Sequence, residues 1–175
     1  FSEPAARTAD SIIAQINPKM PTLGGKKISL DKIDYIVPAE SGLYTIGRAE
    51  IDARTQTIAD YVAELVEDGA TIQLGIGALP DAIARNLMDK KDLGVHSETL
   101  TEAMMELVQA GVINNSKKTL NPGICIGAQA AGSEKFYEFI DHHPLFAVYP
   151  VDYVNNPYVV GQNYKQTSIN SCMEV

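Results

Sequence analysis

Two short segments contain residues whose types and spacing could do chemistry. The first is Gly75, Ile76, Gly77 and Ala78, which follows an apolar segment and precedes Pro80, a residue suited to the first turn of a helix. Glycine lets the backbone approach an anion, and the first N–H groups of a helix are free donors. The segment lacks the third glycine of a dinucleotide fingerprint and has no Walker lysine. It predicts either an anion or oxyanion contact or only a tight turn.

The second segment, HSE, ends at Glu98 and closes an expected short strand. Thr99 and Glu102 have the spacing of a capping box, which predicts a helix with Thr99 as its N-cap. Glu98 would then lie beside the positive end of that helix, stay ionised and be available as a nucleophile. The alternative is a solvated glutamate that merely precedes the helix. For His96 the alternatives are a general base and a satisfied polar residue.

The remaining histidines and the cysteines predict no metal site. His142 and His143 are adjacent and lack a third ligand. Cys125 and Cys172 fit neither a disulfide framework nor a zinc motif. We therefore expect both cysteines to be buried free thiols in a reducing cytoplasm.

Composition narrows the class of protein. The 175 residues are 45% hydrophobic and 21% charged, as in a globular protein with a real core. A formal net charge of −8 argues against nucleic acid or an anionic membrane as a main partner, while it leaves room for a local basic pocket. No apolar run approaches the roughly 18 residues of a membrane span, and no signal peptide is visible. The expected location is the cytoplasm.

Strand and helix patterns alternate along the chain, which predicts an α/β fold: a parallel sheet with flanking helices and right-handed crossovers. One helix should begin at Glu50 and end near Asp68, with an apolar face of Ile51, Ile58, Val62, Leu65 and Val66. Further helices are expected over 80–90, 100–111 and 133–143, and strands or strand-loop segments over 12–16, 27–40, 70–77, 93–98, 123–132, 146–156 and 167–175.

Residues 38–49 (PAESGLYTIGRA) are small, polar and glycine-containing, which is typical of a linker. The chain begins at Phe1 without a methionine and stops at Glu174 and Val175, inside an expected strand. We therefore expect a fragment of a longer protein.

Several long stretches resemble one family. They are LGIGALPDAIARNL, KKDLGVHSETLTEAMMELVQAGVINNSKKTLNPG, GSEKFYEFIDHHP, YPVDYVNNPYVV, TSINSCMEV and, near the start, IAQINPKMP. Together these stretches resemble family I CoA-transferases of the acetyl-CoA hydrolase/transferase group, such as 4-hydroxybutyrate and butyryl-CoA:acetate CoA-transferases. The stretch SETLTEAM departs from the commoner family version, which contains methionine and aspartate, but it keeps the glutamate.

The resemblance implies a CoA-transferase (NagB/RpiA-like) fold of two related α/β domains with the active site between them. Residues 1–37 would be the C-terminal tail of the first domain, 38–49 the linker, and 50–175 the second domain, truncated at its C-terminal end. Glu98 matches the family's catalytic glutamate. Gly75, Ile76, Gly77 and Ala78 match the segment that lines the acyl site and donates to the thioester oxyanion.

The activity that the resemblance implies is ping-pong transfer of CoA from acetyl-, butyryl- or 4-hydroxybutyryl-CoA to a short-chain carboxylate through a glutamyl-CoA thioester. Coenzyme A would be a substrate, with no further cofactor, and a homodimer or homotetramer is implied. One alternative is an acetyl-CoA hydrolase, which would result if water entered the same site. Others are a catalytically silent CoA-binding α/β module and a structural fragment.

Overall fold

The computed structural model describes residues 2–171, and Cys172, Glu174 and Val175 lie outside them. The helices are α1 (Ser2–Thr8), η1 (Leu30–Lys32), α2 (Ala53–Glu64), α3 (Ala78–Arg85), α4 (Glu102–Gln109), α5 (Glu134–Ile140), α6 (Val151–Val154) and α7 (Pro157–Val160). The strands are β1 (Ile13–Ile16), β2 (Gly24–Gly25), β3 (Tyr35–Pro38), β4 (Thr71–Leu74), β5 (Gly94–Val95), β6 (Thr99–Thr101), β7 (Cys125–Gly127), β8 (Gln129–Ala131), β9 (Phe146–Val148) and β10 (Gln166–Ile169). No helix in this part of the chain has the length and apolar character needed to cross a membrane.

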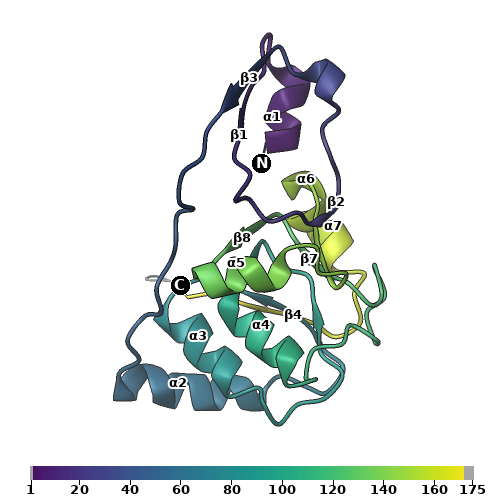
Figure 1. The fold of residues 1–175 in the computed structure, drawn as a ribbon. Coiled ribbons are helices and arrows are strands. Elements are labelled where there is room, and N and C mark those ends of the chain that lie inside the picture. Colours follow the sequence, from purple (N-terminus) through teal and green to yellow (C-terminus); the bar gives the residue numbers. More distant parts are fainter. Residues whose placement is uncertain (1, 172–175) are drawn as a thin grey trace.

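A parallel sheet forms the centre of the molecule (Figure 1). Its strands pair in two groups, β10-β4-β5 and β2-β9-β7, and an isolated bridge between His96 and Ile126 joins β5 to β7. Beyond this bridge, β6 and β8 continue the directions of β5 and β7 and pair with each other in parallel. The predicted fold class, a parallel sheet with flanking helices, is confirmed.

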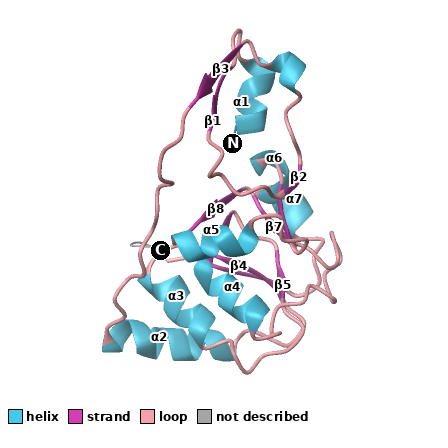
Figure 2. Cartoon of the chain, viewed as in Figure 1, coloured by secondary structure: helices cyan, strands magenta, loops and turns pink. Residues whose placement is uncertain are grey.

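The buried core lies between these strands and the helices α2, α3, α4 and α5, which neighbour one another in that order (Figure 2). Its largest fully buried side chains belong to strands and helices alike: Ile72, Leu74, Ile83, Leu87, Leu93, Leu100, Met104, Met105, Leu107, Ile113, Phe136 and Phe146. β5, β6 and β7 are buried throughout, whereas β4 and β10 carry polar residues such as Gln73 and Ser168 on a face that is less covered.

The helix expected from Glu50 is shorter than predicted, and its apolar face agrees in part: Val66 is buried, and Ile51 and Val62 pack against the core. It begins at Ala53, because the Asp52 side chain accepts the backbone N–H of Thr55 and caps the helix. Ala59 and Ala63 are the buried positions, whereas Ile58 is 40% and Leu65 is 77% exposed. Small residues face the core here because α2 packs closely against α3.

The predicted capping box is wrong. Thr99 lies within strand β6, and α4 begins at Glu102 with Thr101 as its N-cap, without a side-chain capping bond. The reason is tertiary: Thr99, Leu100 and Thr101 pair with Gln129–Ala131, and these three residues of β6 are buried. Glu98 is therefore separated from α4 by a strand, and the predicted helix end does not stand next to it.

The N-terminal residues form a separate arm at the top of the view in Figure 1, where β1 and β3 pair in parallel. Residues 39–52, which include most of the predicted linker, contain no helix or strand and return to the main body. The arm also contributes β2, which pairs with β9 at the edge of the central sheet. The expected strand-loop over 146–156 is a strand followed by α6, and α7 comes next.

Candidate active site

Glu98 lies where β5 and β6 are interrupted, and its backbone is fixed on both sides. Its carbonyl oxygen accepts the N–H groups of Ala128 at 2.8 Å and Gln129 at 3.1 Å, across the matching interruption between β7 and β8. On the other side, the Ser97 hydroxyl donates to the Leu74 carbonyl at 3.1 Å and accepts its N–H at 3.3 Å. The sheet thus fixes the backbone from which the Glu98 side chain projects.

The Glu98 carboxylate is partly exposed and is held by one amide. Nδ2 of Asn155, just after α6, donates to Oε2 of Glu98 at 2.6 Å. Within residues 2–171 no hydrogen bond reaches the other oxygen, Oε1. One carboxylate oxygen is therefore oriented by the protein, and the other can face a reactant.

Two hollows meet at Glu98. One, of about 270 Å³, is bordered by Gly75, Ile76 and Thr99. The other, of about 370 Å³, is bordered by the α6–α7 corner and by His96. Gln73 and Asn170 border both, and their side-chain amides donate to each other's oxygen at 3.0 Å. Glu98 therefore sits between a glycine-lined hollow and one with an apolar wall of Val154, Pro157 and Val160.

The glycine turn lies beside Glu98, but its N–H groups are not equivalent. The N–H of Gly75 donates to the Ile169 carbonyl at 2.9 Å and so belongs to the sheet. Within the described residues the N–H groups of Ile76 and Gly77 have no backbone partner. Gly77 has φ +116 and ψ −176, a conformation that side chains avoid. Of these free N–H groups, that of Ile76 belongs to a residue that borders the hollow beside Glu98. Gly77 borders the hollow on the other side of Ile76, and Ala78 begins α3.

His96 is a satisfied buried residue. Its side chain is 1% exposed; Nε2 lies 3.0 Å from the Val154 carbonyl oxygen, and Nδ1 lies 3.1 Å from Nδ2 of Asn163. Its ring also stacks on Tyr153, with ring centroids 5.9 Å apart. Burial lowers the pKa of His96, which favours the neutral ring. Of the two alternatives, the structure matches the satisfied polar residue.

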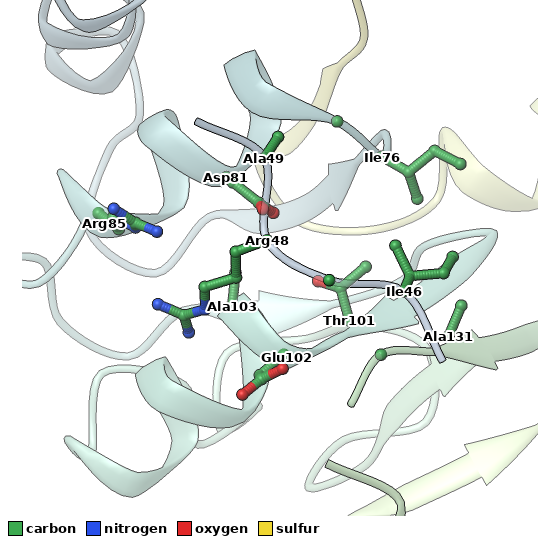
Figure 3. A pocket seen from close by; sticks show the side chains of 13 residues that line it. Ile46, Arg48, Ala49, Ile76, Asp81, Arg85, Thr101, Glu102, Ala103 and Ala131 are labelled. Carbon is green, nitrogen blue, oxygen red and sulfur yellow. The ribbon is translucent and has the colours of Figure 1, made fainter. Parts of the chain in front are cut away.

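A third hollow, of about 230 Å³, lies on the other side of Ile76 and is closed by residues 46–49 (Figure 3). Arg48 enters from that segment and pairs with Glu106 of α4. Glu102, at the first position of α4, borders this hollow rather than capping a helix. Burial raises the pKa of Asp81 on its far wall. Arg85 also borders this hollow, so the two arginines and the two acids of its lining, Asp81 and Glu102, balance in formal charge.

The thiol of Cys125 is free and buried, as expected; Cys172 is not among the described residues. Asn115 donates to its sulfur at 3.2 Å, and burial raises the pKa of Cys125 to about 11. Nearby, buried Lys118 donates to the carbonyls of Val95 and Ile124 at 2.7 and 2.6 Å, and burial lowers its pKa to about 8. The described residues contain no cluster of three or more His, Cys, Asp or Glu side chains that could hold a metal ion.

Sequence reasoning missed the polar residues around Glu98, above all Asn155. The sequence did contain a signal that could have indicated Asn155. Asn155 follows β9, and segments that follow parallel strands gather at the carboxyl edge of the sheet, where Glu98 also lies. Reading residues 146–156 as an undivided strand and loop hid this position.

A parallel α/β sheet with an oriented glutamate and a glycine turn at its carboxyl edge defines a class: an α/β domain with a carboxylate-based site for small molecules. Residues 132–175 match the family model described as acetyl-CoA hydrolase/transferase C-terminal domain. The whole chain is 47% identical over 176 residues to 4-hydroxybutyrate coenzyme A transferase of Clostridium kluyveri, of which it covers 41%. It is 32% identical over 175 residues to butyryl-CoA:acetate CoA-transferase of Anaerostipes caccae, with 95% of the chain and 39% of that relative aligned.

Solved structures show the same similarity in three dimensions. The 4-hydroxybutyrate CoA-transferase abfT-2 of Porphyromonas gingivalis superimposes with a TM-score of 0.93 at 38% identity, over 99% of this chain and 44% of that one. RipA of Yersinia pestis superimposes with a TM-score of 0.91 at 36% identity, over 97% and 40%. Over its whole length the chain is therefore similar to CoA-transferases, and residues 132–175 match the acetyl-CoA hydrolase/transferase family. It spans about two fifths of the length of the curated relatives that it matches.

Proposed function

We propose that the protein containing this chain is a CoA-transferase that uses Glu98 as its nucleophile. It would move CoA from an acyl-CoA, such as acetyl-, butyryl- or 4-hydroxybutyryl-CoA, to a short-chain carboxylate. The relatives' names support the substrate class, since they name transfer of CoA involving butyrate, acetate and 4-hydroxybutyrate. Coenzyme A takes part as a substrate, and the proposal needs no other cofactor.

The observation that carries this proposal is the geometry of Glu98. A carboxylate is a weak nucleophile, so most of the rate must come from placement and from donors to the developing oxyanion. Two observations support such a placement: the backbone of Glu98 is anchored across the sheet, and Asn155 orients one oxygen of its carboxylate. The adjacent glycine-lined hollow can receive a thioester carbonyl.

The first half of the reaction forms an enzyme thioester. A carboxylate oxygen of Glu98 attacks the thioester carbon of acyl-CoA; the C–S bond breaks, and CoA leaves as a thiolate. The product is an acyl-glutamyl anhydride. The thiolate then attacks the glutamyl carbonyl carbon, the bond between this carbon and the bridging oxygen breaks, and the donor acid leaves as a carboxylate that keeps this oxygen. Glu98 is now a glutamyl-CoA thioester.

The second half repeats these steps with the acceptor. The acceptor carboxylate attacks the glutamyl thioester and displaces CoA thiolate, which gives a second anhydride. The thiolate attacks the acceptor's acyl carbon, so a new acyl-CoA forms and the Glu98 carboxylate is restored. The amide of Asn155 and the N–H of Ile76 would be the donors to the oxyanions. Removing one buried, preorganised oxyanion donor typically lowers kcat about 10²–10³-fold, and the partly exposed contact of Asn155 should be worth less.

The test is mass spectrometry of the full-length protein after incubation with butyryl-CoA or acetyl-CoA and then borohydride. Borohydride reduces a glutamyl-CoA thioester to an alcohol, so a mass loss mapped to Glu98 is expected. Glu98→Gln should show no such change, and the exposed acid on α5, Glu138→Gln, serves as the matched control. Unmodified Glu98 in wild-type protein that still binds CoA would reject the transferase proposal and favour a hydrolase or a silent binding module.

A further inference from the structure

The α6–α7 corner, residues 151–160, carries the amide that holds Glu98, and two buried residues away from the reacting atoms fix this corner to the sheet. His96 and Glu98 are two residues apart on one extended segment and border the same hollow. His96 contacts the Val154 carbonyl, and the next residue, Asn155, contacts Glu98. Two hydrogen bonds, one at His96 and one at Glu98, therefore join this segment to two consecutive residues of the corner, Val154 and Asn155.

The geometry determines which ring nitrogen of His96 carries the proton. The Val154 carbonyl oxygen can only accept, so Nε2 at 3.0 Å must donate. At the other nitrogen, the orientation of the Asn163 amide is set independently, because its Oδ1 accepts the N–H of Leu120 at 3.2 Å. Its Nδ2 therefore faces Nδ1 of His96 at 3.1 Å and needs an acceptor there. Both contacts require a neutral ring protonated at Nε2.

We propose that His96 and Asn163 are positioning residues that act through Asn155. Asn163 selects the form of His96 that is protonated at Nε2. This form donates to the Val154 carbonyl, which fixes the neighbouring Asn155 so that its amide contacts Glu98. This inference rests on the proposed function of Glu98. His96 and Asn163 are 1% and 6% exposed, so water does not readily replace either contact. Stacking on Tyr153, whose hydroxyl donates to Asn121 at 2.7 Å, holds the ring from a third side.

Substitutions in the full-length protein test this arrangement. The readout is the single-turnover rate of glutamyl-CoA formation at Glu98, with KM for the acyl-CoA measured in parallel. His96→Ala should lower the rate about tenfold and leave KM within about twofold. His96→Gln, which keeps a donor for Val154, should recover part of the loss. His142→Gln, a change of an exposed histidine outside the site, should match the wild type.

A double-mutant cycle separates this role from general destabilisation. If His96 acts through Asn155, then His96→Ala should cost less than about twofold once Asn155→Ala is present. Additive losses, or wild-type rates in both His96 variants, would overturn the proposal while the labelling of wild-type Glu98 still stood. No labelling of the wild type would overturn the function and this inference together.

Nitrogen-15 NMR of the histidine side chains gives a readout that does not depend on activity. Wild-type His96 should be neutral, with the proton on Nε2. In Asn163→Asp the new carboxylate keeps the acceptor for Leu120 but presents an oxygen to Nδ1, so the ring should take up a proton there. A wild-type ring protonated at Nδ1 would contradict the proposed arrangement.

Discussion

Nδ2 of Asn155 lies 2.6 Å from Oε2 of Glu98, although 57 positions separate the two residues in the chain. A hydrogen bond to a charged group contributes about 1.5–3 kcal/mol, and partial exposure to water reduces this. Asn155→Ala should therefore lower kcat for CoA transfer about tenfold. Asn155→Asp should lower it further, because a second negative charge beside Glu98 repels the carboxylate and turns it away. Steady-state kinetics on purified full-length variants measures both effects.

A matched control exists elsewhere in the chain. Asn114 donates to the Asp92 carboxylate at 2.7 Å, so Asn114→Ala removes the same kind of bond outside the site. Its kcat should equal that of the wild type. Equal losses in Asn114→Ala and Asn155→Ala would mean that both changes act through stability.

The glycine turn should tolerate a methyl group poorly at Gly77. Its φ of +116 lies where side chains are strained, so Gly77→Ala should lower the free energy of unfolding by about 1 kcal/mol or more. Gly42→Ala is the comparison, because an added Cβ there meets no atom within 4 Å. Urea denaturation of the two variants measures the difference. Equal stabilities would show that the turn at Gly77 relaxes freely.

Two buried groups with opposite pKa shifts, Lys118 and Cys125, should determine how the free energy of unfolding changes with pH above about 8. Lys118 has a pKa of about 8, against 10.5 for an ordinary lysine, so the unfolded chain binds more protons between these values and stability should rise with pH. Cys125 has a pKa of about 11, against 9.0, so its contribution should fall above pH 9. The wild type should therefore gain stability mainly between pH 8 and 9.

Substitution separates the two groups. In Cys125→Ala the rise in stability should continue to about pH 10.5, and in Lys118→Met it should disappear. Lys117→Met changes the exposed neighbouring lysine and should keep the wild-type profile. Chemical denaturation from pH 7 to 10.5 gives these profiles. An unchanged profile in Lys118→Met would show that this lysine is not depressed in the folded protein.

His96 should make the fold sensitive to acid. Its pKa in the folded protein lies below the ordinary value of 6.5, so the unfolded chain takes up the proton first as pH falls. Its contribution to stability is complete above pH 6.5 and should be lost progressively below it. The slope between pH 6.5 and 5 should be smaller in His96→Gln than in the wild type, whereas His142→Gln should retain it. Equal slopes in all three proteins would exclude a depressed pKa.

Much of the fold could be predicted because its signals are local. Pro80 and the glycines marked the start of α3, and the strands at Ile72 and Val95 follow from apolar runs between turns. The capping box failed because Thr99 and Glu102 have the right spacing, but pairing with Gln129 holds Thr99 in a strand. The pairing of the buried strand β6 with β8, about 30 residues further along the chain, therefore outweighed the local preference for a helix cap.

The surroundings of Glu98 were harder to predict because they depend on contacts distant in sequence. No pattern near Asn163 indicates that it faces His96, and Asn155 lies in a segment whose short helices have weak sequence signals. The position of Glu98 at the sheet edge could be predicted from strand order, and the same argument places Asn155 near that edge. That Asn155 contacts Glu98, and Asn163 contacts His96, depends on how the α6–α7 corner packs on the sheet, which no local pattern determines.

The sheet uses the carbonyl oxygen of Glu98, which binds Ala128 and Gln129, and makes no use of its carboxylate. If Glu98 is the nucleophile proposed above, folding and reactivity depend on different atoms of the same residue. Since glutamate and glutamine codons differ by one nucleotide, a chain with glutamine at this position is one mutation away, keeps the same backbone hydrogen bonds and should fold as its parent does. Such a descendant could keep its ligand and serve as a sensor, so residue 98 deserves inspection before activity is assigned to any relative.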